Sequence, residues 1–188
     1  MALSKKELKK WEILKSKRII DNKYLKVRQD TVRLPDGTIY NDYYVREEKG
    51  WSAIFCLTED GKVVLNRQYK HGIGEIVLEL PAGRIEEGES PEESIKRELE
   101  EETGYKVEGL ELVGEFISSS TSSTGRVWVY LGRGAKLTGK KVEDAREIVN
   151  VELATPKELL EKVRKGEIKS QGHVAAIYLV LDKLGILK

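Results

Sequence analysis

Short runs of alternating apolar and polar residues dominate the first quarter of the chain. The alternation occurs in four segments: residues 24–28, 30–34, 38–40 and 43–45. Successive side chains of a strand point to opposite faces, so this pattern, with a Pro35-Asp36-Gly37 turn in its middle, predicts a small antiparallel sheet. Before it, residues 3–11 place Leu8 and Trp11 on one side of a short amphipathic helix, with a frayed terminus as the alternative.

Apolar runs that alternate with helical patterns begin near Trp51. Strands are expected at residues 52–57, 63–68, 110–114, 127–131 and 148–153, with a strand end at 78–80. Residues 132–146 have mixed charge and little periodicity, which is typical of a mobile loop. The order of strands, helix, strands and helices predicts an α+β fold, a mixed sheet covered by helices. We expect an N-terminal antiparallel β extension at 1–48 and a core domain at 49–188.

Three helices carry recognisable start and stop signals. Ser90-Pro91-Glu92-Glu93 forms a capping box, and Gly104 is placed to end a helix over 91–103 with a buried stripe of Ile95 and Leu99. Thr155 begins a second helix that Gly166 ends. Ser170 is expected to cap the last helix, whose inward residues are Ala175, Ile177, Tyr178, Leu179, Val180 and Leu184.

Three glutamates of the first helix, Glu98, Glu101 and Glu102, are spaced i, i+3 and i+4. That spacing puts them on one helix face, where like charges repel. Between Glu79 and Glu102 the local formal charge is −7. A hard divalent cation would relieve the repulsion and leave ligand positions open for phosphate oxygens and water. The alternative is an ordinary solvated helix face, which more often mixes charge signs.

The same segment matches the Nudix hydrolase signature, GX5EX7REUXEEXGU, in which U is aliphatic. Every fixed position is filled, with Tyr105 in place of the final aliphatic residue; the matching residues are Gly83, Glu89, Arg97, Glu98, Leu99, Glu101, Glu102 and Gly104. Outside this segment, Glu79–Gly83 and Arg67–Tyr69 resemble the ADP-ribose pyrophosphatase branch. The resemblance implies a Nudix-type α/β/α sandwich with a mixed sheet.

Glu98 and Glu102, one helical turn apart, are the first choices as ligands of Mg²⁺, with Mn²⁺ as an alternative. Glu101 is next, and the carbonyl of Ala82 or Gly83 could complete the shell. Glu89 and Arg97 are interpreted as a structural pair that ties the preceding loop to the helix. Gly83 and Gly104 are interpreted as structural residues of the motif.

The resemblance also implies a catalytic base from a downstream loop. Glu147 is the first candidate and Glu143 the alternate, with Asp144 in the same loop; a solvated charged loop is the competing interpretation. Arg67 is the best candidate for a phosphate-binding cation, followed by Arg46 and Arg84, each of which would otherwise be a surface charge. His71 and His173 are too far apart in sequence to suggest a zinc pair.

The expected reaction is Mg²⁺-dependent cleavage of the pyrophosphate bond of ADP-ribose or a related nucleoside diphosphate sugar. The products would be a nucleoside monophosphate and a sugar phosphate. The Ser-Pro-Gly turn expected in the ADP-ribose branch is absent, since Ser120 and Thr121 hold its place. The alternatives are therefore another nucleoside diphosphate derivative such as GDP-mannose, a nucleoside triphosphate, or nucleotide binding without catalysis.

Composition narrows the cellular setting. The 188 residues are 39% hydrophobic and 35% charged with a net charge of +1, so no overall basic field indicates nucleic acid as a partner. The single cysteine, Cys56, lies in an apolar run and is expected to be a buried thiol. With no signal peptide or long apolar run, we expect a cytoplasmic protein that binds no membrane. The resemblance implies a homodimer that exchanges its N-terminal sheets.

Overall fold

The structure of the chain, a computed structural model, describes residues 7–139, 141–142 and 148–187. Its internal contacts divide the chain into two units, each considered by itself below. Unit 1 contains Met1–Glu48 and Ser119–Gly125, and unit 2 contains Lys49–Ser118 and Arg126–Lys188. Residues 119–125 therefore group with the N-terminal segment in space. The division into functional domains at 1–48 and 49–188 stays a prediction.

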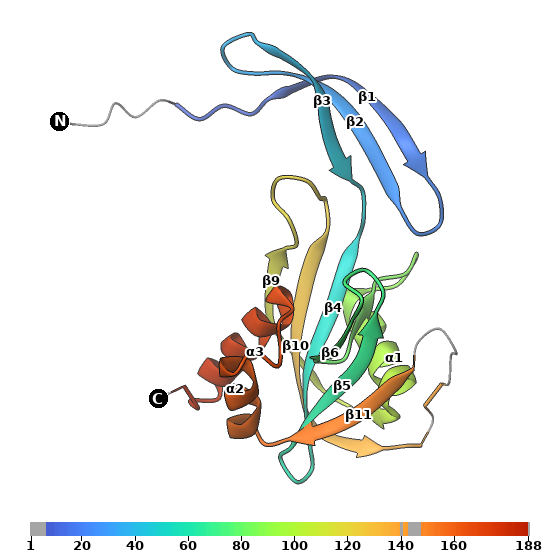
Figure 1. The fold of residues 1–188 in the computed structure, drawn as a ribbon, viewed down its shortest axis with the longest axis vertical. Helices are drawn as coiled ribbons and strands as arrows, with labels where there is room; N and C mark the ends of the chain where they lie inside the picture. The colour runs from blue at the N-terminus through green and yellow to red at the C-terminus, as the bar shows by residue number, and fades with distance from the viewer. Residues whose placement is uncertain (1–6, 140, 143–147, 188) are drawn as a thin grey trace, which may run out of the picture. The chain divides into compact units, whose positions relative to one another are not determined.

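Unit 1 is built on a three-stranded antiparallel sheet in the order β1-β2-β3 (Figure 1). Its strands are β1 Glu12–Asp21, β2 Lys26–Arg33 and β3 Ile39–Arg46. The predicted strands at 24–28 and 30–34 fall largely within one strand, β2, which continues through Asp30 with a register shift against β3 between Asp30 and Val32. Gly37, with φ of 89°, closes the β2–β3 turn in a conformation that favours glycine.

The predicted amphipathic helix at 3–11 is not formed by its described residues, 7–11, and strand β1 follows them directly. Every residue of β1 is exposed. With no buried face the strand has no strict period-two pattern, which is why the sequence did not reveal it.

Unit 2 contains a mixed eight-stranded sheet within the described residues, with the order β11-β5-β4-β10-β8 and three further strands paired to it. Strands β4 and β10 are parallel, and their other pairings are antiparallel. The strands are β4 Gly50–Thr58, β5 Val63–Lys70, β6 Glu75–Glu79, β7 Ala82–Arg84, β8 Tyr105–Lys106, β9 Leu110–Ile117, β10 Arg126–Leu137 and β11 Val149–Ala154. The α+β prediction is confirmed.

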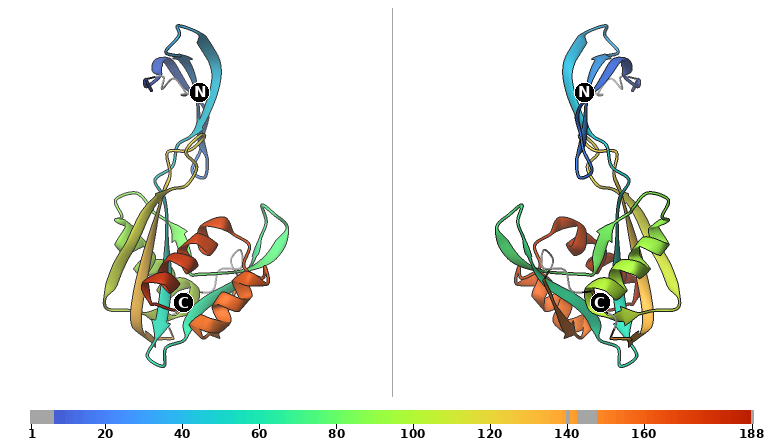
Figure 2. Two further views of the ribbon diagram at one scale, coloured as in Figure 1. Left: turned by 90° about the vertical axis from the view of Figure 1, so that its left-hand side faces the viewer. Right: turned by 90° about the vertical axis from the view of Figure 1, so that its right-hand side faces the viewer.

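In the described ranges, three helices cover the two faces of this sheet: α1 Pro91–Thr103, α2 Pro156–Arg164 and α3 Gln171–Lys183. Strand β4 shows how the faces are assigned, because Ile54 and Cys56 join an apolar cluster with α1, while Phe55 joins a second cluster with α2 and α3. Accordingly, α1 lies on one side of the sheet and α2 and α3 lie on the other (Figures 1 and 2). This is the predicted α/β/α sandwich.

The caps of α1 and α2 form as the sequence predicts. Ser90 Oγ accepts the amide of Glu93, Glu93 accepts the amide of Ser90, and Gly104 ends α1 with φ of 73°. Thr155 makes the same reciprocal bonds with Glu158. Ser170 is the N-cap residue of α3, as expected, but it makes no side-chain cap bond, because its hydroxyl donates to the carboxylate of Glu79 instead.

Two further expectations need correction. Residues 132–137 continue β10 by pairing with β9 and β8, so the predicted mobile loop at 132–146 does not include them. On α3, Ile177 and Val180 are buried and Leu184 is partly buried, but Ala175, Tyr178 and Leu179 are exposed. An apolar stripe on a helix is narrower than a continuous apolar run suggests. None of the helices in the described ranges is long and apolar enough to cross a membrane.

Candidate active site

The acidic face of α1 lies beside the strand β7 and the loop that joins β7 to the helix. Ala82 of β7 pairs with Ala53 of β4, which anchors the start of the signature segment on the sheet. The loop bends back through Glu89, and the capping box then starts α1 at Pro91. The last turn of α1 returns to β7, because Glu102 Oε2 accepts the amide of Ala82 at 3.2 Å. The sheet therefore fixes both ends of the segment.

Gly83 makes room for the side chain of Glu98. A Cβ added to Gly83 would lie 1.9 Å from Cδ and 2.1 Å from Oε1 of Glu98. The φ of Gly83 is not positive within this strand, so steric space is the reason for glycine here. The structure thus brings the first glycine of the signature and its first helical glutamate into direct contact.

The guanidinium of Arg97 holds the carboxylates around it. It donates from Nε and Nη2 to Glu89 at 2.8 and 3.0 Å, and from Nη1 to Glu98 at 2.9 Å and Glu101 at 3.1 Å. These contacts raise the pKa of Arg97, and the Arg97 hydrogen bonds lower the pKa of Glu89. The expected Arg97–Glu89 contact is present, while its structural role in the enzyme stays a prediction.

Glu102 is a strongly perturbed carboxylate of the site. Burial and the negative charge of Glu98 raise the pKa of Glu102 to about 8. Lys70 and two hydrogen bonds act in the opposite direction: the amide of Ala82 donates at 3.2 Å, and Asn66 Nδ2 donates at 2.7 Å. The result is a buried acid group poised near neutral pH, an arrangement that occurs often at functional sites.

The three predicted metal-binding glutamates do not form a ready-made cluster in this structure. Across the described residues, no three acidic, histidine or cysteine side chains gather closely enough to hold an ion. Arg97 draws Glu98 and Glu101 to itself, and Glu102 turns toward β5 and β7. The residues nevertheless fit a divalent cation, because Glu98 and Glu102 are hard oxygen ligands one helical turn apart. The pKa of Glu102 is raised by burial and, second, by the negative charge of Glu98, and a cation would offset both effects.

The candidate catalytic bases Glu143 and Glu147, with Asp144, lie outside the described residues. The described segment just before them follows the end of α1. The amide of Thr138 donates to the carbonyl of Gly104 at 2.8 Å, and the amide of Val142 donates to the carbonyl of Glu101 at 2.9 Å. The role of these carboxylates stays a prediction.

The three arginines expected to bind phosphate are placed in different surroundings. Arg67 of β5 forms a two-pronged ion pair with Glu152 of β11. Arg46 lies in unit 1 and pairs with Glu48 at 2.8 Å. Arg84 belongs to β7, where its carbonyl accepts the Ser94 hydroxyl at 3.2 Å. Their substrate roles stay predictions.

Sequence reasoning missed a polar group within unit 2, formed by Lys70, Glu79, Ser170 and His173. Glu79 is buried, lies 3.8 Å from Lys70 Nζ, and accepts the Ser170 hydroxyl. His173 is buried 3.7 Å from Glu79 and stacks on Trp51 at 5.3 Å; burial lowers its pKa. Lys70 directly follows the Arg67-Gln68-Tyr69 segment. Its position next to a candidate phosphate-binding arginine was the one signal in the sequence for this group.

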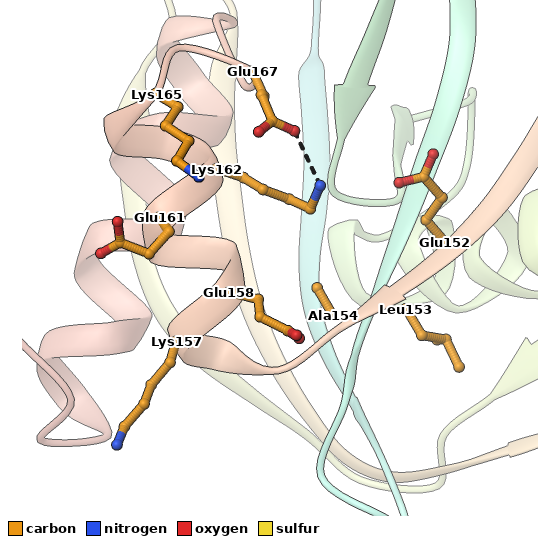
Figure 3. A pocket seen from close by; sticks show the side chains of 9 residues that line it. All are labelled: Glu152, Leu153, Ala154, Lys157, Glu158, Glu161, Lys162, Lys165 and Glu167. Carbon is orange, nitrogen blue, oxygen red and sulfur yellow. Dashed lines mark hydrogen bonds and ion pairs between the residues drawn. The ribbon is translucent and has the colours of Figure 1, made fainter.

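A cavity lies elsewhere in unit 2. It has a volume of about 670 Å³ and lies between β11 and α2 (Figure 3). Negatively charged glutamates and positively charged lysines line it, and Lys162 forms an ion pair with Glu167 at 3.0 Å. The α1 glutamates do not line this cavity, and its mixed charge indicates no ligand.

The arrangement of β7, its loop and α1 is that of a Nudix protein, and the chain belongs to the Nudix family: the NUDIX domain matches residues 48–173. The Nucleoside diphosphate sugar hydrolase N-terminal domain matches residues 11–45. The resemblance seen in the sequence is confirmed.

Two relatives align over most of the chain. The methanol dehydrogenase activator of Bacillus methanolicus is 31% identical over 172 residues, covering 90% of this chain and 92% of that protein. The ADP-ribose pyrophosphatase of Bacillus subtilis (strain 168) is 31% identical over 167 residues, covering 88% of this chain and 90% of that protein. A crystal structure of an ADP compounds hydrolase matches 97% of this chain and 100% of its own with a TM-score of 0.82; at 19% identity it shows the fold alone.

Proposed function

We propose that the chain is a hydrolase that uses a divalent cation, Mg²⁺ or Mn²⁺, to cleave the pyrophosphate bond of a nucleoside diphosphate sugar. ADP-ribose is the first substrate to test. The observation that carries the proposal is the buried Glu102 beside Glu98, with a pKa of about 8, on the signature helix of a Nudix chain. The N-terminal match and the ADP-ribose pyrophosphatase of B. subtilis support the substrate class.

We assign the proposed roles to individual residues of α1 and β7. Glu98 and Glu102 would hold the cation, with Glu101 and the carbonyl of Ala82 as further ligands. A bound divalent cation supplies charge neutralisation at the pyrophosphate and lowers the pKa of water. Arg97 keeps α1 against the loop that contains Glu89, so that the ligands stay on a rigid element.

Substrate charge also calls for a protein cation. Arg67 forms an ion pair with Glu152. The side chain of Lys70 is 40% exposed, and its Nζ lies 3.8 Å from Glu79. Lys70 also lies close enough to lower the pKa of Glu102. Lys70 is therefore added to Arg67, Arg46 and Arg84 as a phosphate-binding candidate. Glu147 and Glu143 remain the candidates for the base, supported by the bond between Val142 and Glu101.

The direct test is hydrolysis of a panel of nucleotide sugars and nucleoside triphosphates with Mg²⁺ or Mn²⁺, with separation of the products. Cleavage of ADP-ribose to AMP and ribose phosphate is expected. Glu98→Gln and Glu102→Gln should each lose more than the roughly 10–100-fold that is typical of outer-shell substitutions. Glu92→Gln on the same helix, where Glu92 is exposed and pairs with Lys96, is the matched control and should keep activity. Near-normal turnover of both ligand variants would contradict the proposal.

The expected partner is a second copy of the chain. In unit 1, Ile13, Val32 and Tyr40 lie in one row across the three strands, and Ile13 and Tyr40 are 57% and 46% exposed. Val32, between them, is buried at 4% exposure, so the row is exposed at its two ends. Exposed apolar side chains that gather on one face can mark an association surface. The cytoplasmic location expected from the sequence stays a prediction.

A further inference from the structure

A single polar side chain interrupts the apolar face that β5 turns toward α1. Val64 of this face belongs to the apolar cluster that contains Ile95 and Leu99. Asn66, two residues further along the strand, points to the same face and is completely buried. Burying an amide costs free energy unless its donor and acceptor groups both find partners.

Asn66 finds a partner for only one side of its amide. Nδ2 donates to Glu102 Oε2 at 2.7 Å, whereas Oδ1 is buried and has no hydrogen-bond partner within the described part of the chain. A half-satisfied buried amide is less favourable than an apolar side chain of the same size. Stability of the sheet therefore does not explain Asn66, and its bond to Glu102 is the feature that remains.

The bond has a geometry suited to orienting a metal ligand. Among the described residues, the hydrogen bonds to the Glu102 carboxylate both end on Oε2, one from Asn66 of β5 and one from the amide of Ala82 of β7. Two donors from different strands fix this oxygen, and the other oxygen, Oε1, is left to a ligand. Both donors are neutral, so they orient the carboxylate without supplying a positive charge that would compete with a cation.

We propose that Asn66 is a positioning residue, which orients Glu102 for divalent-cation binding through the Nδ2–Oε2 hydrogen bond. This inference rests on the proposed function, since it assumes that Glu102 binds the cation. Partners of this kind hold the orientation of a ligand, and their loss typically weakens metal affinity or activity by about 10–100-fold.

The test compares Asn66→Leu with wild-type protein. Leucine has the same branching at Cγ, with methyl groups in place of the amide oxygen and nitrogen, and neither donates nor accepts hydrogen bonds. Mn²⁺ binding to the substrate-free protein is measured by electron paramagnetic resonance, and thermal unfolding is measured with EDTA present. We expect the Mn²⁺ dissociation constant to rise at least about tenfold, while the melting temperature does not fall. The rate of hydrolysis should fall at low Mn²⁺ and recover in part at high Mn²⁺.

Val64→Ala is the matched control on the same face of the same strand. It opens a cavity and should lower the melting temperature, but should leave the Mn²⁺ dissociation constant within about twofold of wild type. If Asn66→Leu melts at a lower temperature than wild type, the test uses Asn66→Val instead, because valine is smaller than leucine and favours strands.

Unchanged Mn²⁺ affinity in the Asn66 variants would overturn the inference and leave the proposed function standing. Equal weakening of Mn²⁺ binding in Val64→Ala would also overturn it, because packing would then be the cause. Wild-type protein that neither binds Mn²⁺ nor hydrolyses any nucleotide would overturn the inference and the proposed function together. If Glu102→Gln still bound Mn²⁺ as tightly as wild type, Glu102 would not be a metal ligand, and the inference would be overturned.

Discussion

At the scale of single residues, the proton on Glu102 links the candidate site to pH. The ordinary pKa of a glutamate is 4.5, and the pKa of folded Glu102 is about 8, because burial and Glu98 disfavour its charge. Between these pH values the folded protein binds one more proton than the unfolded chain. The free energy of unfolding of the metal-free protein should therefore fall as pH rises from about 4.5 to 8, by on the order of a few kcal/mol.

The measurement is denaturant unfolding in EDTA at several pH values for wild type and Glu102→Gln. Glutamine has no proton to release, so the difference between the two proteins isolates Glu102 from other titrating groups such as His173. We expect wild type to lose stability relative to the variant as pH rises. A difference that does not change with pH would show that Glu102 titrates alike in the folded and unfolded chains.

A second residue-scale prediction concerns Gly83. In Gly83→Ala the new methyl group would occupy the position of the Glu98 carboxyl, so Glu98 must move away. We expect hydrolysis to fall by at least about tenfold, as for a displaced metal ligand. Gly109→Ala, where an added Cβ meets no atom within 4 Å, is the control in the same unit. Equal activity of the two variants would contradict the steric role of Gly83.

Residues of the site differ in how far the sequence reveals them. The helix that holds Glu98, Glu101 and Glu102 could be predicted, and helical spacing makes the three glutamates candidates because it puts like charges on one face. Asn66 could not be predicted, because one polar residue in an apolar strand has no periodic signal and its partner Glu102 is 36 positions away. The pairing of Arg67 with Glu152 depends equally on a distant strand.

At the scale of elements, Arg97 joins α1 to the loop before it. Arg97→Gln would leave Glu89, Glu98 and Glu101 without their shared cation. Because hydrogen bonds to charged groups contribute about 1.5–3 kcal/mol, we expect a loss of about that size. For a chain of this length the melting temperature should fall by about 2–4 °C per kcal/mol, and hydrolysis should fall with it.

The control for this prediction is Arg126→Gln, which removes an exposed pair with Glu115 at 2.9 Å. An exposed ion pair contributes little to stability, so this variant should melt close to wild type. If Arg97→Gln also melts like wild type while its activity is lost, Arg97 acts on the substrate instead of holding the loop.

Elements with strong local signals were the ones that the sequence placed well. Helix α1 has a capping box, Pro91 at its start and Gly104 at its end, and its predicted range matches Pro91–Thr103. Strand β1 has no buried face, and the last residues of β10 pair with the short distant strand β8. Their strand structure comes from cross-strand hydrogen bonds, which leave no period-two pattern in the sequence.

At the scale of the whole molecule, the remaining question is association. The sheet of unit 1 presents the apolar row of Ile13, Val32 and Tyr40, and leaving Ile13 and Tyr40 exposed to water is unfavourable. Association of two copies through this sheet would remove that exposure. We therefore expect wild-type protein to be a dimer by sedimentation or light scattering at micromolar concentration.

Substitution of the row should shift this equilibrium. A lysine at position 13 or 40 would have to lose its hydration at an apolar interface, so Ile13→Lys and Tyr40→Lys should each weaken dimerisation about tenfold or more. Leu112→Lys in unit 2, at a site with 51% exposure, is the comparison that tests whether any added charge has this effect. A monomeric wild type would rule out the dimer outright. A dimer that the two unit 1 substitutions leave intact would place the interface on another surface, because a buried lysine cannot be neutral to an interface that covers it.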